Sequence, residues 1–166
     1  MRSIWIISPI IAIGLTTSTL AQQPAPQATK DLIGTWSLVS VTAQAPNGPV
    51  TNADLGPNPQ GRLNFDANGN YSLMVMAGDL PKFAENDRFK GSATENEAVV
   101  KGSISHFGHY SVNGGDINFN IEYSTFPNWN KMEQQRHFAI NDDKLSYYFT
   151  PPGGQSTVRL VWQHMQ

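Results

Sequence analysis

Turn-forming residues divide most of this chain into short segments in which apolar and polar side chains alternate, a pattern typical of β-sandwiches and β-barrels. Three of the divisions are tight, at residues 67–69, 113–115 and 141–144. Two of them contain Asn-Gly, which between alternating segments is the strongest short-range signal for a β-hairpin. The sequence therefore predicts consecutive hairpins, and with them an antiparallel sheet.

The alternating segments predict eight strands, joined mostly in meander order. These strands cover residues 34–43, 61–66, 70–76, 107–112, 116–124, 132–140, 145–150 and 157–163. Between the third and fourth strands, Thr94 and Glu97 have the spacing of a capping box, which predicts a helix over residues 95–102. Closure of such a sheet removes its edge strands. We therefore predict an all-β, eight-stranded antiparallel up-and-down barrel with one short inserted helix.

Residues 1–21 have the features of a secretory signal peptide. Arg2 is followed by an apolar run over residues 4–15, and Thr19 and Ala21 supply the small residues that a signal peptidase requires. The run is shorter than the roughly 20 residues that span a bilayer, and no cysteine follows it that could be lipidated. We expect cleavage near Ala21, a periplasmic or secreted location, and no membrane span in the mature protein. The alternative is an uncleaved membrane anchor.

The composition of residues 22–166 limits which kinds of protein the rest of the chain can be. Residues 22–30 are rich in Gln, Ala and Pro and predict a disordered leader, followed by a single domain over residues 31–166. The chain has no cysteine, so its core must be stable without disulfides. Without Arg2, ten basic side chains face thirteen acidic ones. This balance excludes the basic surface that nucleic-acid binding requires.

Several motifs are similar to those of a known group of small barrels. Gly34-Thr35-Trp36 resembles the Gly-x-Trp signature of lipocalins. Together with it, the segments GPNPQGRLNFD, NGNYSLMVM, PKFAENDRFKG, GSISHFGHYSV, STFPNW and LVW resemble the bacterial and fungal lipocalin-like domain proteins. The resemblance covers residues 32–162. It implies a calycin-type barrel with an internal cavity, closed at one end by Trp36, and it implies no particular ligand or catalytic residue.

One charged side chain falls on a strand face that is predicted to point inward. Arg136 has the same parity in its strand as Phe138 and Ile140. A guanidinium inside an apolar barrel needs a partner, because burying an unpaired charge is costly. Two interpretations stay open: Arg136 binds the carboxylate of a small apolar ligand, or it pairs with an internal carboxylate such as Glu122.

Five aromatic side chains complete the predicted ligand-binding site. Tyr110, Tyr123 and Tyr147 share the parity of apolar neighbours and are predicted to point inward, either to orient a ligand or to fill the core. Phe126 and Trp129 belong to the segment STFPNW. They either close one end of the barrel over a ligand or pack the loop onto the scaffold.

These features predict an exported protein that binds a small, mainly apolar ligand in the barrel cavity. The alternative is a cavity-based isomerase or cyclase that uses a His–carboxylate pair, such as His109 with Glu122, or a tyrosine as acid or base. A third interpretation is a barrel filled by its own aromatic side chains that acts through its rim. The sequence assigns no catalytic residue and leaves the oligomeric state open.

The histidines do not predict a metal centre. His106 and His109 are three residues apart and would lie on opposite faces of one strand. No other cluster has the spacing of zinc ligands, of which a site needs at least three from the protein. We expect neither a metal nor a cofactor.

Overall fold

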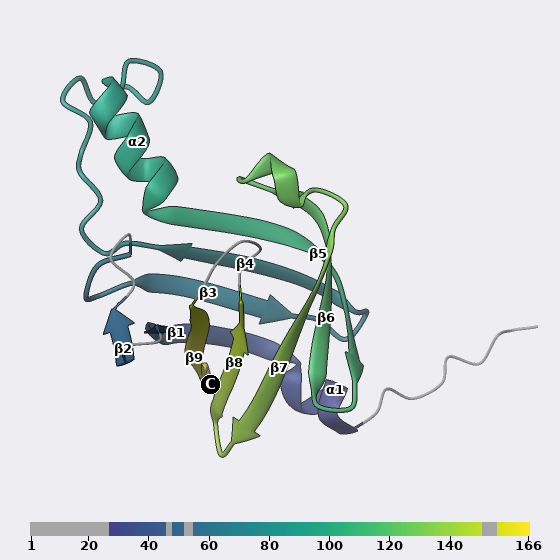
Figure 1. Cartoon of the computed structure of the whole chain (residues 1–166). Coiled ribbons are helices and arrows are strands. Elements are labelled where there is room, and N and C mark those ends of the chain that lie inside the picture. The colour runs from purple at the N-terminus through teal and green to yellow at the C-terminus, as the bar shows by residue number, and fades with distance from the viewer. Residues whose placement is uncertain (1–26, 46–47, 52–54, 151–155) are drawn as a thin grey trace, which may run out of the picture.

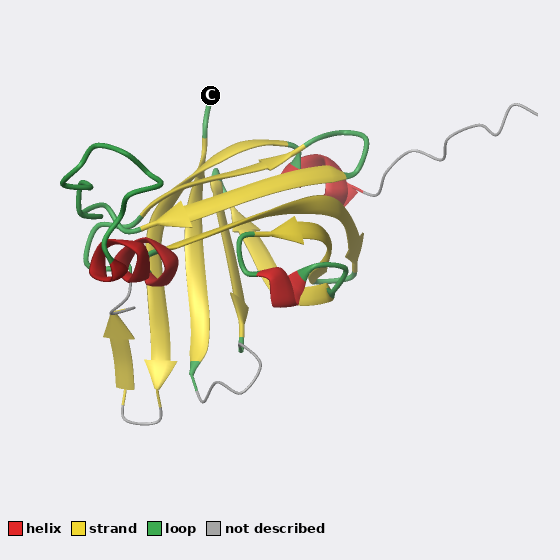
Figure 2. Cartoon of the chain, turned by 90° about the horizontal axis from the view of Figure 1, so that it is seen from above, coloured by secondary structure: helices red, strands yellow, loops and turns green. Residues whose placement is uncertain are grey.

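The structure is a computed structural model that describes residues 27–45, 48–51, 55–150 and 156–166. Its elements in chain order are α1 (Gln27–Leu32), β1 (Gly34–Ala45), β2 (Gly48–Thr51), β3 (Gln60–Phe65), β4 (Asn70–Met76), α2 (Ala93–Lys101), β5 (Ser103–Asn113), β6 (Asp116–Ser124), the 3-10 helix η1 (Pro127–Trp129), β7 (Glu133–Asn141), β8 (Lys144–Phe149) and β9 (Thr157–His164). Strands make up most of the described chain (Figure 2). None of the described helices is long and apolar enough to cross a membrane.

Within the described residues, the strands form one antiparallel sheet in the order β2-β1-β3-β4-β5-β6-β7-β8-β9, and β1 also pairs with β9 (Figure 1). The β1–β9 pairing closes β1 and β3–β9 into an eight-stranded barrel. Each of these strands overlaps one of the eight predicted strands. The predicted fold class is therefore confirmed, with β2 as an additional short strand paired to the end of β1.

The three predicted hairpins all form. In the turn between β3 and β4, Asp66 Oδ1 accepts hydrogen bonds from the backbone N–H groups of Asn68 and Asn70, each 2.8 Å long. Gly69 follows with a φ of 84°, a conformation that a residue without Cβ adopts at little cost. In the turn between β5 and β6, Gly114 has a φ of 60°. The turn residues therefore supply the backbone conformations that tight hairpins require.

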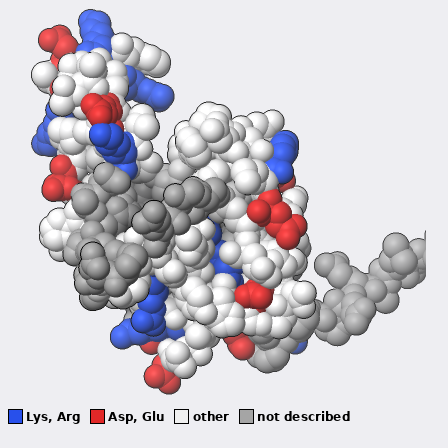
Figure 3. Space-filling view, viewed as in Figure 1, with Lys and Arg blue, Asp and Glu red and all other residues white. Residues whose placement is uncertain are grey.

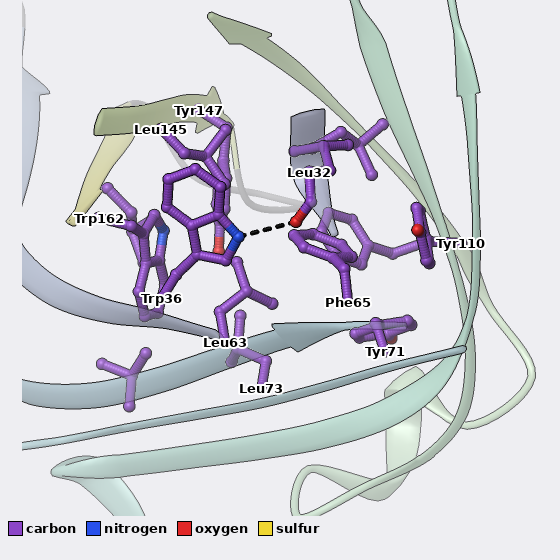
Figure 4. Packing of buried hydrophobic residues seen from close by; sticks show 14 of the residues in the cluster. Leu32, Trp36, Leu63, Phe65, Tyr71, Leu73, Tyr110, Leu145, Tyr147 and Trp162 are labelled. Atoms are coloured by element: carbon purple, nitrogen blue, oxygen red, sulfur yellow. Dashed lines mark hydrogen bonds between the residues drawn. The ribbon is translucent and has the colours of Figure 1, made fainter. Parts of the chain in front are cut away.

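The inward side chains of the barrel form a hydrophobic core that includes Trp36, Leu63, Phe65, Leu145 and Trp162 (Figure 4). Trp36 is 1% exposed. Its Nε1–H donates a hydrogen bond to the Leu32 carbonyl oxygen at the end of α1, 2.8 Å away. Trp36 thus lies buried at the end of the barrel that α1 covers, which is the place that the resemblance implied.

Helix α1 covers the end of the predicted leader. It includes residues 27–30, which their composition had assigned to a disordered segment. The helix ends in Leu32, which is fully buried and bonded to Trp36, so the barrel itself holds this turn in place. The predicted signal peptide and residues 22–26 lie outside the described residues.

Helix α2 lies between β4 and β5, as predicted, but its cap differs. Ser92, and not Thr94, is the N-cap: its hydroxyl accepts from the Glu95 N–H, while the Glu95 carboxylate accepts from the Ser92 N–H. Glu97 instead pairs with Lys101 one turn later, at 2.6 Å. Both Ser92 and Thr94 fit the capping-box pattern. With Ser92 as the cap, the Glu95 carboxylate also accepts a hydrogen bond from the backbone N–H of Ala84.

Candidate functional site

A cavity of about 460 Å³ lies within the barrel on the side of α2 and η1. Most of its walls are apolar, and the described residues that line it are Val41, Leu55, Leu73, Val75, Val99, Val100, Lys101, Ser103, Ile104, His106, Thr125, Phe126, Trp129, Arg136, Tyr147, Phe149, Val158 and Leu160. The charged members are Lys101 and Arg136, and no carboxylate is among them. In the space-filling view, Lys or Arg atoms are visible inside a recess of this face (Figure 3). The cavity therefore joins a large apolar surface to a positive charge.

Arg136 is the buried charge of the cavity, with 4% of its surface exposed. It points inward from β7, as its parity predicts. Its Nη2 donates to the Gln134 side-chain oxygen, 2.5 Å away. Its Cζ lies 3.6 Å from the centroid of the Phe149 ring, with Tyr147 and Phe119 farther off. Burial lowers the pKa of Arg136 from its usual value, but arginine stays protonated at physiological pH.

No described carboxylate forms a salt bridge with Arg136. The interpretation that Glu122 is its internal partner is wrong. Glu122 follows the inward Ile121 in β6, and its Oε1 lies 2.9 Å from Nε2 of His109, where both side chains are well exposed. The predicted His109–Glu122 pair thus exists, but on the outside of the barrel.

The three tyrosines are placed differently. Tyr147 is buried and lines the cavity, and this burial raises its pKa to about 12. Tyr110 also points inward, but it donates to the Asp66 carbonyl, 2.9 Å away, and is not among the residues that line the cavity. The inward prediction for Tyr123 is wrong, because this side chain is 55% exposed.

The reason for the Tyr123 error is a register shift. Between β5 and β6, Tyr123 pairs with Phe107 and Ile121 pairs with Gly108, so Glu122 has no direct partner. A bulge of this kind changes which face the following side chains occupy. Tyr123 therefore turns outward beside Phe107, and the Lys131 ammonium lies 4.8 Å from its ring centroid.

Phe126 and Trp129 lie at one end of the cavity, on the segment that contains η1. Their ring centroids are 5.7 Å apart, and the rings meet edge to face. Trp129 also makes an edge contact with His106, with the centroids 5.9 Å apart. The two aromatic residues thus extend the apolar wall from the core to the surface.

His106 completes the polar part of the cavity. It points inward from β5 and is 3% exposed, while His109 points outward, so the two lie on opposite faces as predicted. Nδ1 of His106 lies 2.8 Å from the Tyr71 hydroxyl oxygen. Burial, together with the nearby Arg136 charge, lowers the pKa of His106 to about 3. The imidazole is therefore neutral at physiological pH.

The sequence matches the lipocalin-like domain family over residues 33–165. The chain belongs to the lipocalin-like domain family. Among solved structures, this lipocalin-like chain is similar to a lipocalin-like protein from Bacteroides uniformis, with 16% identity and a TM-score of 0.45 over 81% of this chain and 99% of that one. It is also similar to a variant of the fluorescent protein UnaG, with 15% identity and a TM-score of 0.39 over 81% of this chain and 96% of that one. A search of the curated proteins finds no match.

Sequence reasoning thus found four residues of this lipocalin-like cavity, Arg136, Tyr147, Phe126 and Trp129, and missed the contribution of His106. The predicted strand began at residue 107, whereas β5 begins at Ser103. An extension of the predicted strand by one residue would have given His106 the inward parity of Tyr110. The alternation of residues 106–110 was therefore the available signal.

Proposed function

We propose that this lipocalin-like protein binds a small, mainly apolar molecule whose anionic group, such as a carboxylate, pairs with Arg136 inside the barrel. The observation that carries this proposal is the buried guanidinium without a carboxylate partner among the described residues. Burying a single charge costs several kcal/mol. Stacking on an aromatic ring such as Phe149 offsets part of that cost, about 2 kcal/mol or more for a desolvated cation. A ligand anion would supply the remaining stabilisation through charge-assisted hydrogen bonds.

The size and lining of the cavity support an apolar body for the ligand. A volume of about 460 Å³ falls within the range of roughly 300–1,000 Å³ that is usual for small-molecule sites. Valine, leucine and isoleucine make up nine of the eighteen described residues that line the cavity. Their burial against an apolar ligand contributes about 25 cal/mol per Å². Affinity would therefore come from the walls and orientation from Arg136.

Two dyes of nearly the same shape test the proposal, since 8-anilinonaphthalene-1-sulfonate is anionic and N-phenyl-1-naphthylamine is neutral. We expect both to bind in the cavity, with the anionic dye binding at least about tenfold more tightly, because one charge-assisted hydrogen bond contributes about 1.5–3 kcal/mol. Fluorescence titration of the mature protein at physiological salt measures both affinities. Equal binding of the two dyes would contradict a role for Arg136 in selecting an anion.

Two observations favour binding over acid–base catalysis. The His109–Glu122 pair, which the alternative hypothesis placed in the cavity, lies on the outer surface. His106 faces the cavity, but a pKa of about 3 makes it a weak proton acceptor near neutral pH. Efficient general bases have pKa values close to the working pH. The cavity is therefore better suited to holding a molecule than to moving a proton.

Export remains part of the proposal, and it rests on the sequence of residues 1–21. A charged start, a short apolar run and small residues before Gln22 are the features that a signal peptidase recognises. We expect the mature protein to begin at Gln22. Mass spectrometry of the protein recovered from the periplasm or medium of an expressing bacterium measures this directly, and a full-length protein retained in the membrane fraction would contradict it.

A further inference from the structure

Tyr71 and His106 form a buried polar pair at the wall of the cavity. Tyr71 lies on β4 and His106 on the neighbouring β5, where the register pairs Tyr71 with Gly108. Both side chains are buried, and the Tyr71 oxygen lies 2.8 Å from His106 Nδ1. Their rings meet edge to face with centroids 5.5 Å apart. The imidazole is therefore held in one orientation.

The hydrogen-bond network assigns the proton in this contact. Tyr71 has no other hydrogen bond within the described residues. If His106 Nδ1 donated to it, the phenolic hydrogen of Tyr71 would be buried without an acceptor, which is unfavourable. If Tyr71 donates to Nδ1 instead, the donor left over belongs to His106, which lines the cavity, where water or a ligand can accept from it. We therefore assign the proton of this contact to Tyr71.

This assignment places the hydrogen of the neutral imidazole on Nε2. No described residue accepts a hydrogen bond from Nε2, although His106 lines the cavity. Phe119 and Trp129 meet the ring with edge contacts and have no oxygen in their side chains, and the Tyr71 hydroxyl is engaged at Nδ1. The cavity thus contains a fixed, neutral donor in addition to Arg136.

Arg136 and His106 lie on opposite sides of Phe119. Arg136 comes from β7 and His106 from β5, with β6 between them. The centroid of the Phe119 ring is 5.7 Å from Arg136 Cζ and 6.3 Å from the His106 ring centroid. Strands two positions apart in a sheet are separated by about 10 Å. The two donors come from different strands and can contact different atoms of one ligand.

We propose that the ligand carries, besides its anionic group, a neutral acceptor oxygen, such as that of a ketone, which accepts the Nε2–H of His106. This inference rests on the proposed binding of an apolar anion at Arg136. It narrows the ligand class from simple apolar acids to oxygenated ones. Tyr71 acts as a positioning residue, because it fixes the tautomer that presents the donor.

Displacement of the anionic dye by dodecanoic acid, and by dodecanoic acids with a ketone at successive carbons, tests this inference. We expect at least one oxo acid to displace the dye about five- to tenfold better than dodecanoic acid, the effect of one hydrogen bond. His106→Phe should remove that preference, so that the oxo acids and dodecanoic acid displace the dye equally well. His109→Phe, an outward substitution on the same strand, should preserve it.

Two further measurements keep the test independent of folding defects. The double variant Tyr71→Phe/His106→Phe removes both partners of the hydrogen bond together, which leaves no orphaned hydroxyl. It should also lack the ketone preference. In the wild-type protein, long-range ¹H–¹⁵N spectra should show His106 protonated at Nε2, and Tyr71→Phe should weaken this tautomer preference.

Three results would overturn the inference: an Nδ1-protonated His106, a ketone preference that survives in the double variant, or oxo acids that never bind better than dodecanoic acid. A failure of the dye and of all acids to bind would instead refute the proposed function itself. The two failures are therefore distinguishable by the binding of plain dodecanoic acid.

Discussion

Arg136→Met is expected to weaken binding of the anionic dye about 100-fold while increasing the free energy of unfolding by about 1–3 kcal/mol. The loss of affinity follows because methionine cannot donate the charge-assisted hydrogen bonds that Arg136 supplies. The gain in stability follows because the guanidinium is buried without a carboxylate partner among the described residues, whereas methionine matches the apolar surroundings. Dye titration and urea denaturation measure the two effects.

The neutral dye and a second arginine provide the controls for this variant. N-phenyl-1-naphthylamine should bind the wild-type protein and Arg136→Met alike, since it carries no anion. Arg159 is exposed on β9 and does not line the large cavity, so Arg159→Met should change neither dye affinity. Arg136→Lys should recover only part of the affinity, because lysine keeps the charge but lacks the planar fork. A destabilised Arg136→Met protein that still prefers the anion would refute the assignment.

Trp36→Ala is expected to reduce the free energy of unfolding by about 3–5 kcal/mol, the usual cost of removing a large buried aromatic side chain. The variant leaves a void between the barrel and α1 and deprives the Leu32 carbonyl of its donor. Since domains of this size are stable by only about 5–15 kcal/mol, much of the variant would unfold under mild conditions. Urea denaturation followed by circular dichroism gives the value.

Trp129→Ala is the matched control for Trp36→Ala, because it removes the same side chain from the other end of the barrel. Trp129 is only partly buried and packs on Phe126 and His106. Its loss should cost roughly 1 kcal/mol of stability and should weaken binding of both dyes equally. Similar losses of stability in the two variants would contradict the assignment of Trp36 to the closed end of the barrel and of Trp129 to the open end.

The sequence predicted most of the fold because local and global signals agree. Gly69 and Gly114 adopt the backbone conformations that the hairpins need, and the Asp66 side chain accepts a hydrogen bond within its turn. Each strand between them buries one face, so a period of two residues identifies its inward side chains. Arg136 was predicted to point inward for this reason, and the structure places it in the cavity. Binary patterning alone therefore located the charge of the candidate site.

The errors arise where a local pattern allows two solutions or where register departs from alternation. Ser92 and Thr94 both fit a capping box, and the structure has Ser92 as the cap, with Glu95 also accepting from the Ala84 N–H. Tyr123 turned outward because of the bulge at Glu122, and no residue pattern in β6 reveals a bulge that depends on pairing with β5. The sequence likewise could not show that Tyr71 would reach His106, since their contact depends on the register of β4 with β5.

Closure of the barrel by β1 and β9 has a consequence for how the chain folds. These strands lie at opposite ends of the domain sequence, and their register joins Trp36 to His164. Pairings between distant segments form slowly, because the entropy of closing a long loop is lost before the contacts form. Until residues 157–164 are in place, β1 and β8 are open sheet edges, which are prone to pair with other chains. The pairing of β9 with β1 and β8 therefore completes the cavity. The time that this pairing takes sets how long the open sheet edges can pair with other chains.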